Sequence, residues 1–78
     1  MRVKGMVQVL GSTYRVERVA FGVYDVIRLL DDVVVGRFRT TPHARTESTT
    51  IDGELMNEIV RAAIQGAKTS WVGRISIV

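Results

Sequence analysis

The chain contains no cysteine, which excludes a disulfide framework and a thiolate metal site. Its only histidine, His43, has no thiol and no second imidazole to work with, and a lone imidazole is seldom catalytic. No glycine-rich segment matches the spacing of a phosphate-binding loop. The sequence therefore predicts a protein that is not an enzyme and that holds neither a metal ion nor a cofactor.

Long hydrophobic runs are missing as well. The longest segments free of charge are too short to cross a bilayer. Arg2 and Lys4 interrupt the valines at the N-terminus, where a secretory signal would be continuously apolar. We therefore expect a cytoplasmic location and no membrane partner.

The 78 residues include 46% hydrophobic and 24% charged side chains, which is typical of a folded domain. This length favours one small domain covering residues 1–78. A chain of this size buries only about 60% of its extended surface, so its core is thin. Because no disulfide adds to this core, a homo-oligomer or a complex with a protein partner is a plausible source of further stability.

Positive charge is concentrated in the first half of the sequence. Residues 1–45 carry eight basic and four acidic side chains, a balance of +4, whereas residues 46–78 carry three basic and four acidic ones, a balance of −1. The two balances add to the net charge of +3. Such a distribution keeps acidic partners, nucleic acid among them, as an option.

Three segments rich in Val, Ile, Leu, Tyr and Phe, at about 13–20, 23–30 and 33–39, predict a central antiparallel meander. Apolar residues at helical spacing predict a helix over about 52–68, capped by Thr49 or Asp52. A short C-terminal strand is expected over about 71–78, and another segment typical of a strand covers about 3–10, with the partners of both left open. The fold class is therefore α+β, a mostly antiparallel sheet of 4–5 strands packed against one helix.

The register of the meander decides which side chains face the helix, because a slip of one residue reverses a strand. Pairing Ala20 with Val23 avoids placing Glu17 opposite Asp25, so we prefer it to the register one residue away. A two-residue turn at Asp31-Asp32 completes the meander. The predicted core face is then Tyr14, Val16, Ile27, Leu29, Val34 and Phe38.

The opposite face of this predicted sheet is basic and partly apolar, and it includes Val19, Val26 and Val35. It supplies the candidate nucleic-acid or partner site, which consists of Arg15, Tyr24, Arg28, Arg37 and Arg39. Residues 40–50, which contain five threonines, are expected to form a loop before the helix.

Two functions fit this arrangement. The first is a small non-catalytic interaction module that self-associates or binds another protein, because apolar residues lie on both sheet faces and strand-forming segments lie at both ends. The alternative is a nucleic-acid-binding module in which the arginines contact phosphates and Tyr24 stacks on a base. In element order the chain resembles the arm-binding domains of phage-type integrases and the plant AP2 domain, from which it departs in the Thr-rich segment and the added terminal strands.

Overall fold

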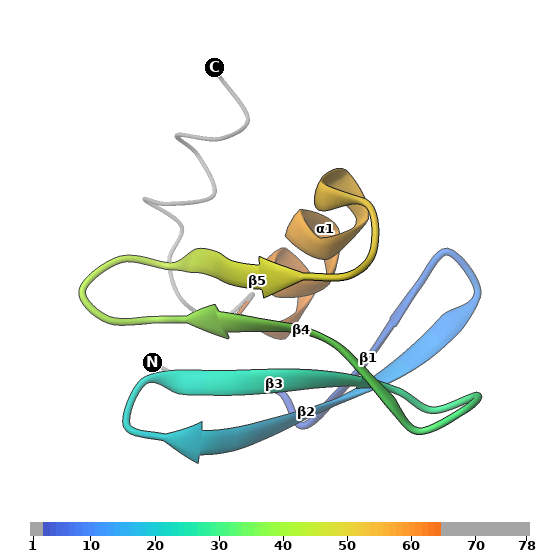
Figure 1. The fold of residues 1–78 in the computed structure, drawn as a ribbon, viewed down its shortest axis with the longest axis horizontal. Helices are drawn as coiled ribbons and strands as arrows, with labels where there is room; N and C mark the ends of the chain where they lie inside the picture. Colours follow the sequence, from blue (N-terminus) through green and yellow to red (C-terminus); the bar gives the residue numbers. More distant parts are fainter. Residues whose placement is uncertain (1–2, 65–78) are drawn as a thin grey trace.

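The structure, a computed structural model, describes residues 3–64 and consists of five strands followed by one helix (Figure 1). The elements are β1 (Met6–Val9), β2 (Ser12–Ala20), β3 (Val23–Arg28), β4 (Val33–Arg39), β5 (Arg45–Thr49) and α1 (Gly53–Ala63). This confirms the predicted α+β fold, with an antiparallel sheet packed against one helix. The C-terminal strand expected at about 71–78, and the end of the predicted helix beyond residue 64, lie outside the described residues.

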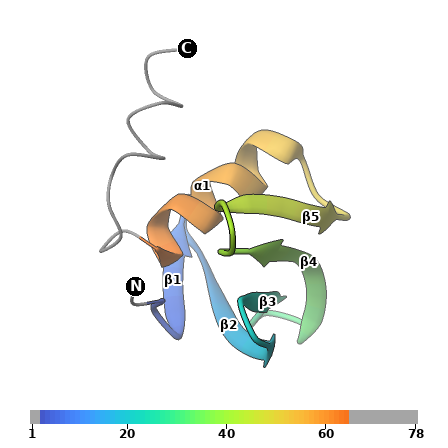
Figure 2. The same ribbon diagram turned by 90° about the vertical axis from the view of Figure 1, so that its left-hand side faces the viewer.

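The sheet is a continuous meander in which each strand pairs antiparallel with the next one in the sequence. It curls around α1, so that both of its outermost strands, β1 and β5, contact the helix (Figure 2). The backbone N–H of Lys4 donates to the carbonyl of Ala63 at 2.8 Å, which joins the segment before β1 to the last turn of α1. The N-terminal segment, whose partner the sequence left open, therefore pairs with β2.

The β2–β3 hairpin follows the preferred register at a single pair. Ala20 lies opposite Val23, but the register then shifts at Val19, and the rest of the hairpin adopts the register that we rejected. Glu17 consequently lies opposite Asp25. This like-charge pairing is tolerated because each of the two carboxylates is hydrogen-bonded by an arginine.

The β3–β4 hairpin also differs from the prediction. Arg28 pairs with Val33, which leaves a four-residue loop of residues 29–32 in place of the two-residue turn. The Asp-Asp pair lacks the glycine that a two-residue turn favours, and only Asp32 adopts a left-handed backbone, with φ of 58°. A second register shift, at Val35, follows in β4.

These shifts reassign half of the predicted core face. Three of its residues pack in the core as expected, namely Tyr14, Val16 and Phe38. Leu29 and Val34 are exposed on the convex face of the sheet, which points away from α1 and is called the outer face below. Ile27 lies on the same face, outside the cluster that contacts α1, but it is buried as predicted, with only 4% of its surface exposed. Their places on the core side are taken by residues that we had assigned to the opposite face: Tyr24, Val26 and Val35. There are two physical causes. The extra residue at Val19 in β2 reverses the side chains of β3 relative to the prediction, and the shift at Val35 exchanges the faces of Val34 and Val35 in β4.

The prediction of a loop over residues 40–50 is wrong for its second half. Arg45–Thr49 form β5, which pairs with β4 and shifts register at Glu47. Threonine favours strands because its β-branched side chain suits a pleated surface, so a Thr-rich segment next to an exposed sheet edge can extend the sheet. Only residues 40–44 remain as a connection.

The start of α1 confirms one of the two proposed caps. The carboxylate of Asp52 accepts hydrogen bonds from the backbone N–H groups of Glu54 and Leu55, at 2.9 and 3.2 Å. This satisfies two of the donors that the first turn of a helix leaves without intrahelical partners. The hydroxyl of Thr49 instead donates to the carbonyl of Ile51, one residue before the cap.

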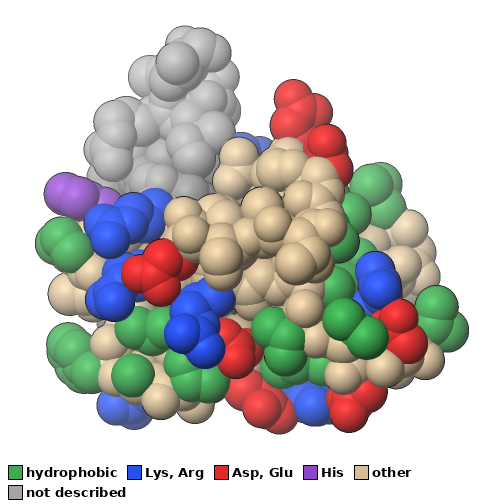
Figure 3. Space-filling view, viewed as in Figure 1, with side chains coloured by type: hydrophobic (Ala, Val, Ile, Leu, Met, Phe, Trp, Pro, Cys, Tyr) green, Lys and Arg blue, Asp and Glu red, His purple; other side chains and the backbone are tan. Residues whose placement is uncertain are grey.

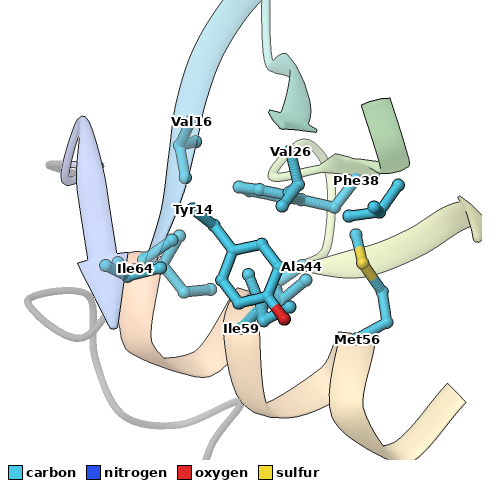
Figure 4. Close-up of a cluster of buried hydrophobic side chains, with 12 residues drawn as sticks. Tyr14, Val16, Val26, Phe38, Ala44, Met56, Ile59 and Ile64 are labelled. Atoms are coloured by element: carbon cyan, nitrogen blue, oxygen red, sulfur yellow. The ribbon is translucent and has the colours of Figure 1, made fainter. Parts of the chain in front are cut away.

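The apolar face of α1 fills the concave side of the sheet (Figure 4). Its fully buried residues are Met56, Ile59, Val60, Ala63 and Ile64, which pack on side chains from β1 to β4 and on Ala44. Met56 reaches the middle of β4 at Gly36, where an added Cβ would lie 2.7 Å from its sulfur and 2.9 Å from the carbonyl of Ser48. Gly36 therefore allows α1 to approach the sheet.

We predict that Gly36→Ala destabilises the protein by about 1–3 kcal/mol, because the new methyl group meets a buried side chain and a backbone carbonyl that cannot both move away. Chemical denaturation monitored by circular dichroism measures this free energy of unfolding. The matched control is Gly53→Ala, whose Cβ meets nothing within 4 Å at the start of α1. Equal stability of the two variants would contradict the proposed close packing of Met56.

Candidate functional site

The arginines of the predicted site do not form an open basic surface, because each of the four is paired with a carboxylate. Arg15 binds Glu17 at 2.5 Å and Asp32 at 3.2 Å. The three remaining pairs are Arg28 with Asp31 at 2.9 Å, Arg37 with Asp25 at 2.7 Å, and Arg39 with Glu47. A phosphate approaching these guanidinium groups would have to compete with bound carboxylates.

Two of these carboxyl groups have a pKa below the ordinary value because of their arginine partners. The hydrogen bond from the Arg28 guanidinium lowers the pKa of Asp31, and the hydrogen bond from Arg39 lowers the pKa of Glu47. Arg28 holds Asp31 through two nitrogens, its Nε at 3.0 Å and its Nη2 at 2.9 Å, which is the fork geometry that suits a carboxylate. Both pairs are partly exposed, so salt screens them.

The structure also separates the five residues of the predicted site. Arg15, Arg37 and Arg39 lie on the outer face, as their pairing with β3 shows. Tyr24 lies on the core side, where its ring stacks on Phe38 with centroids 5.3 Å apart. It therefore cannot present a stacking surface beside those arginines. Arg28 lies opposite Tyr14, and its side chain turns to the β3–β4 loop.

The meander gathers its connections at two ends, because alternate turns of an antiparallel sheet lie on the same side (Figure 1). The β1–β2 turn and the β3–β4 loop border a common hollow lined by Gly11, Ser12, Thr13, Arg28, Leu29 and Leu30. We call this the apolar end. Its exposed large hydrophobic residues are Leu10, Leu29, Leu30, Val33 and Val34. Several green side chains lie toward this side, at the right of Figure 3.

The leucines at the tips of the apolar end are conspicuously unburied. Leu10 is 86% exposed and Leu30 is 90% exposed. Leu10 also has a φ of 51°, in the left-handed region where a branched side chain costs about 1–2 kcal/mol. Asparagine or glycine would suit this turn better, next to Gly11 with its φ of 82°. The chain thus retains an apolar side chain that weakens the folded monomer and is not buried in it.

Sequence reasoning missed this end because it treated Leu29 and Val34 as core residues. A signal was nevertheless present in the Leu10-Gly11 and Leu30-Asp31 pairs, where a leucine stands beside a turn residue. A leucine at a turn contributes little to a sheet core, so its presence there needs another explanation.

The opposite end holds the β2–β3 turn and the β4–β5 connection, joined by a hydrogen bond from the Thr40 N–H to the Gly22 carbonyl at 2.9 Å. We call it the basic end. Several blue side chains lie toward this side in Figure 3. Its charged residues are Arg18, Arg39 and Arg45 against Glu47, whereas the apolar end balances Arg15 and Arg28 with Asp31 and Asp32.

Comparison with protein-family models, curated proteins and solved structures finds no match to this chain. Among residues 3–64, no three His, Asp or Glu side chains are arranged to hold a metal ion. The same residues contain no helix with the length and hydrophobicity needed to span a membrane.

We predict that the stability conferred by the Arg28–Asp31 and Arg39–Glu47 pairs is present near pH 7 and is lost in acid. Both carboxyl groups have a lowered pKa in the folded state, so their contribution is complete above their ordinary pKa of about 4 and disappears as the pH falls below it. The melting temperature of the double variant Asp31→Asn, Glu47→Gln should therefore fall less between pH 6 and pH 2 than that of the wild type.

The matched control removes the donors instead of the acceptors. The double variant Arg28→Gln, Arg39→Gln should likewise show a smaller fall in melting temperature between pH 6 and pH 2 than the wild type. In this variant the carboxyl groups lose the hydrogen bonds that lower their pKa. Parallel acid transitions in the wild type and both double variants would show that these pairs do not contribute.

Proposed function

We propose that the protein is a non-catalytic interaction module that self-associates through the apolar end. The observation that carries this proposal is the presence of five exposed hydrophobic residues at this end of the sheet, two of which, Leu29 and Leu30, line the hollow between its two connections. Contiguous exposed apolar surface on a small protein is typical of a site that a partner covers. The strained Leu10 supports the same reading, since its side chain contributes to stability only when something covers it.

A second copy is the occupant that the charges favour. At the edge of the apolar end, Arg15 and Arg28 lie beside Asp31 and Asp32, so the surface carries charges of both signs. In a two-fold dimer each patch meets itself, and the acidic loop of one copy can face the arginines of the other. A strongly charged partner would gain nothing from such a balanced edge.

Two other occupants fit less well. Nucleic acid would meet Asp31 and Asp32 at the tip of the β3–β4 loop, where they repel phosphates. A membrane would bury Leu30 only by bringing the adjacent carboxylates to its surface, and anionic lipids repel them. Binding to lipid remains an outcome of the experiment below.

We expect Leu30→Asp to abolish association, because it introduces a charge into the centre of the contact. Sedimentation over a range of protein concentrations should show a dimer of the wild type and a monomer of the variant. The melting temperature of the wild type should also rise with protein concentration, whereas that of the variant should not. Phe21→Asp is the matched control, because Phe21 is 78% exposed at the basic end and lies outside the contact.

Leu10→Asn provides a second, opposite readout. Asparagine tolerates the left-handed backbone of residue 10, so the isolated monomer should be about 1 kcal/mol more stable. The same change should weaken the dimer, because it removes a large apolar side chain from the interface. A wild type that remains monomeric at every concentration, or that instead binds lipid vesicles through Leu30, would refute self-association at this end.

A further inference from the structure

A second hollow lies at the basic end, across the sheet from the apolar end. It is lined by Arg18, Phe21, Gly22, Tyr24, Thr40 and Thr41. The β2–β3 turn and the beginning of the β4–β5 connection both line this hollow. The two segments are joined by the Thr40–Gly22 hydrogen bond of 2.9 Å. A Cβ on Gly22 would lie 2.9 Å from the Thr41 hydroxyl, so the two segments are closely packed here.

Arg18 differs from the other arginines of β2 to β4. Within residues 3–64, it has no carboxylate within ion-pair distance, whereas Arg15, Arg28, Arg37 and Arg39 each have one. The nearest acidic residues in the register, Glu17 and Asp25, are already bound by Arg15 and Arg37. The Arg18 guanidinium therefore keeps its donors for an anion from outside.

The remaining lining residues complement this charge. Thr40 and Thr41 offer hydroxyl groups that can donate to oxygen atoms, and Phe21 offers an aromatic ring that is 78% exposed. Tyr24 lies opposite Arg18 in the sheet and is held in place by stacking on the fully buried Phe38. A cation, two hydroxyls and a free aromatic ring around one hollow suit a ligand with an anionic part and a flat part.

We propose that this hollow binds a nucleotide unit of single-stranded nucleic acid, with the phosphate on Arg18 and the base stacked on Phe21. Stacking on an aromatic side chain combined with a basic contact to the backbone is how proteins bind single strands irrespective of sequence. The site is separate from the apolar end. At the basic end, Arg39 and Arg45 outnumber the acidic Glu47, and this excess of positive charge favours a polyanion. Tyr24 is the one residue of the predicted site that lines this hollow, and Arg18 takes the place of the four arginines predicted to contact phosphates.

The experiment measures binding of a fluorescein-labelled oligothymidylate of about 12 nucleotides by fluorescence anisotropy, at low and at physiological salt. Arg18→Gln should weaken binding at least about fivefold and lower the salt dependence by about one phosphate contact. Phe21→Ser should weaken binding by about fivefold or more, with an unchanged salt dependence, because it removes stacking and not charge.

Arg28→Gln is the matched control, because it removes the same charge at the opposite end of the sheet, releases no carboxylate beside Arg18 and leaves the hollow intact. Its affinity should stay within about twofold of the wild type. The proposal is overturned if the wild type does not bind the oligonucleotide, or if Arg28→Gln weakens binding as much as Arg18→Gln. It is also overturned if a phosphothreonine peptide binds more tightly than the oligonucleotide and Phe21→Ser does not affect either. Because no variant in this series alters Leu10 or Leu30, a failure here leaves self-association unaffected.

Discussion

The contact between Met56 of α1 and Gly36 of β4 is the constraint on which the rest of the structure depends. Without a side chain at Gly36, the helix reaches the middle of the sheet, and the sheet can curl until both β1 and β5 touch the helix. The register shift at Val35 serves the same contact, since it places Gly36 opposite Val26 and lets Val35 also point into the core. If α1 lay farther from the sheet, the side chains on the concave side would lose their packing partners, and so small a chain has no other core.

The meander has a second consequence, which is that the two ends of the sheet acquire different chemistry. The β1–β2 turn and the β3–β4 loop lie together at the apolar end, and the β2–β3 turn and the β4–β5 connection lie together at the basic end. Each end combines residues that are roughly twenty positions apart, such as Gly11 with Leu30 or Phe21 with Thr41. The apolar end has balanced charges, whereas the basic end has an excess of arginine. The molecule therefore has two separate surfaces whose exposed side chains differ in chemistry.

The predicted site shows where reasoning from sequence stops. The arginines were predicted correctly to lie in the sheet. Whether they form an open basic surface depends on the carboxylates around them, which the sequence did not place. Asp25 and Arg37 are twelve residues apart, and Arg15 and Asp32 are seventeen apart, so only the register brings each pair together. A slip of one residue at Val19 decided this register, and with it the face on which Tyr24 lies. Such a slip costs little locally, because the side chains that accommodate it belong to other strands.

The sequence by itself determined the order of the elements. Alternation in the strands and the helical spacing that begins at Asp52 are local patterns, and their physical causes lie within a few neighbouring residues. Only the tertiary structure decided that Thr-rich residues 45–49 complete the sheet, that Leu29 and Val34 remain exposed, and that Arg18 differs from the other arginines of β2 to β4. Those outcomes depend on bulges, on ion pairs between strands and on the position of the helix, which are energies of contact between distant segments.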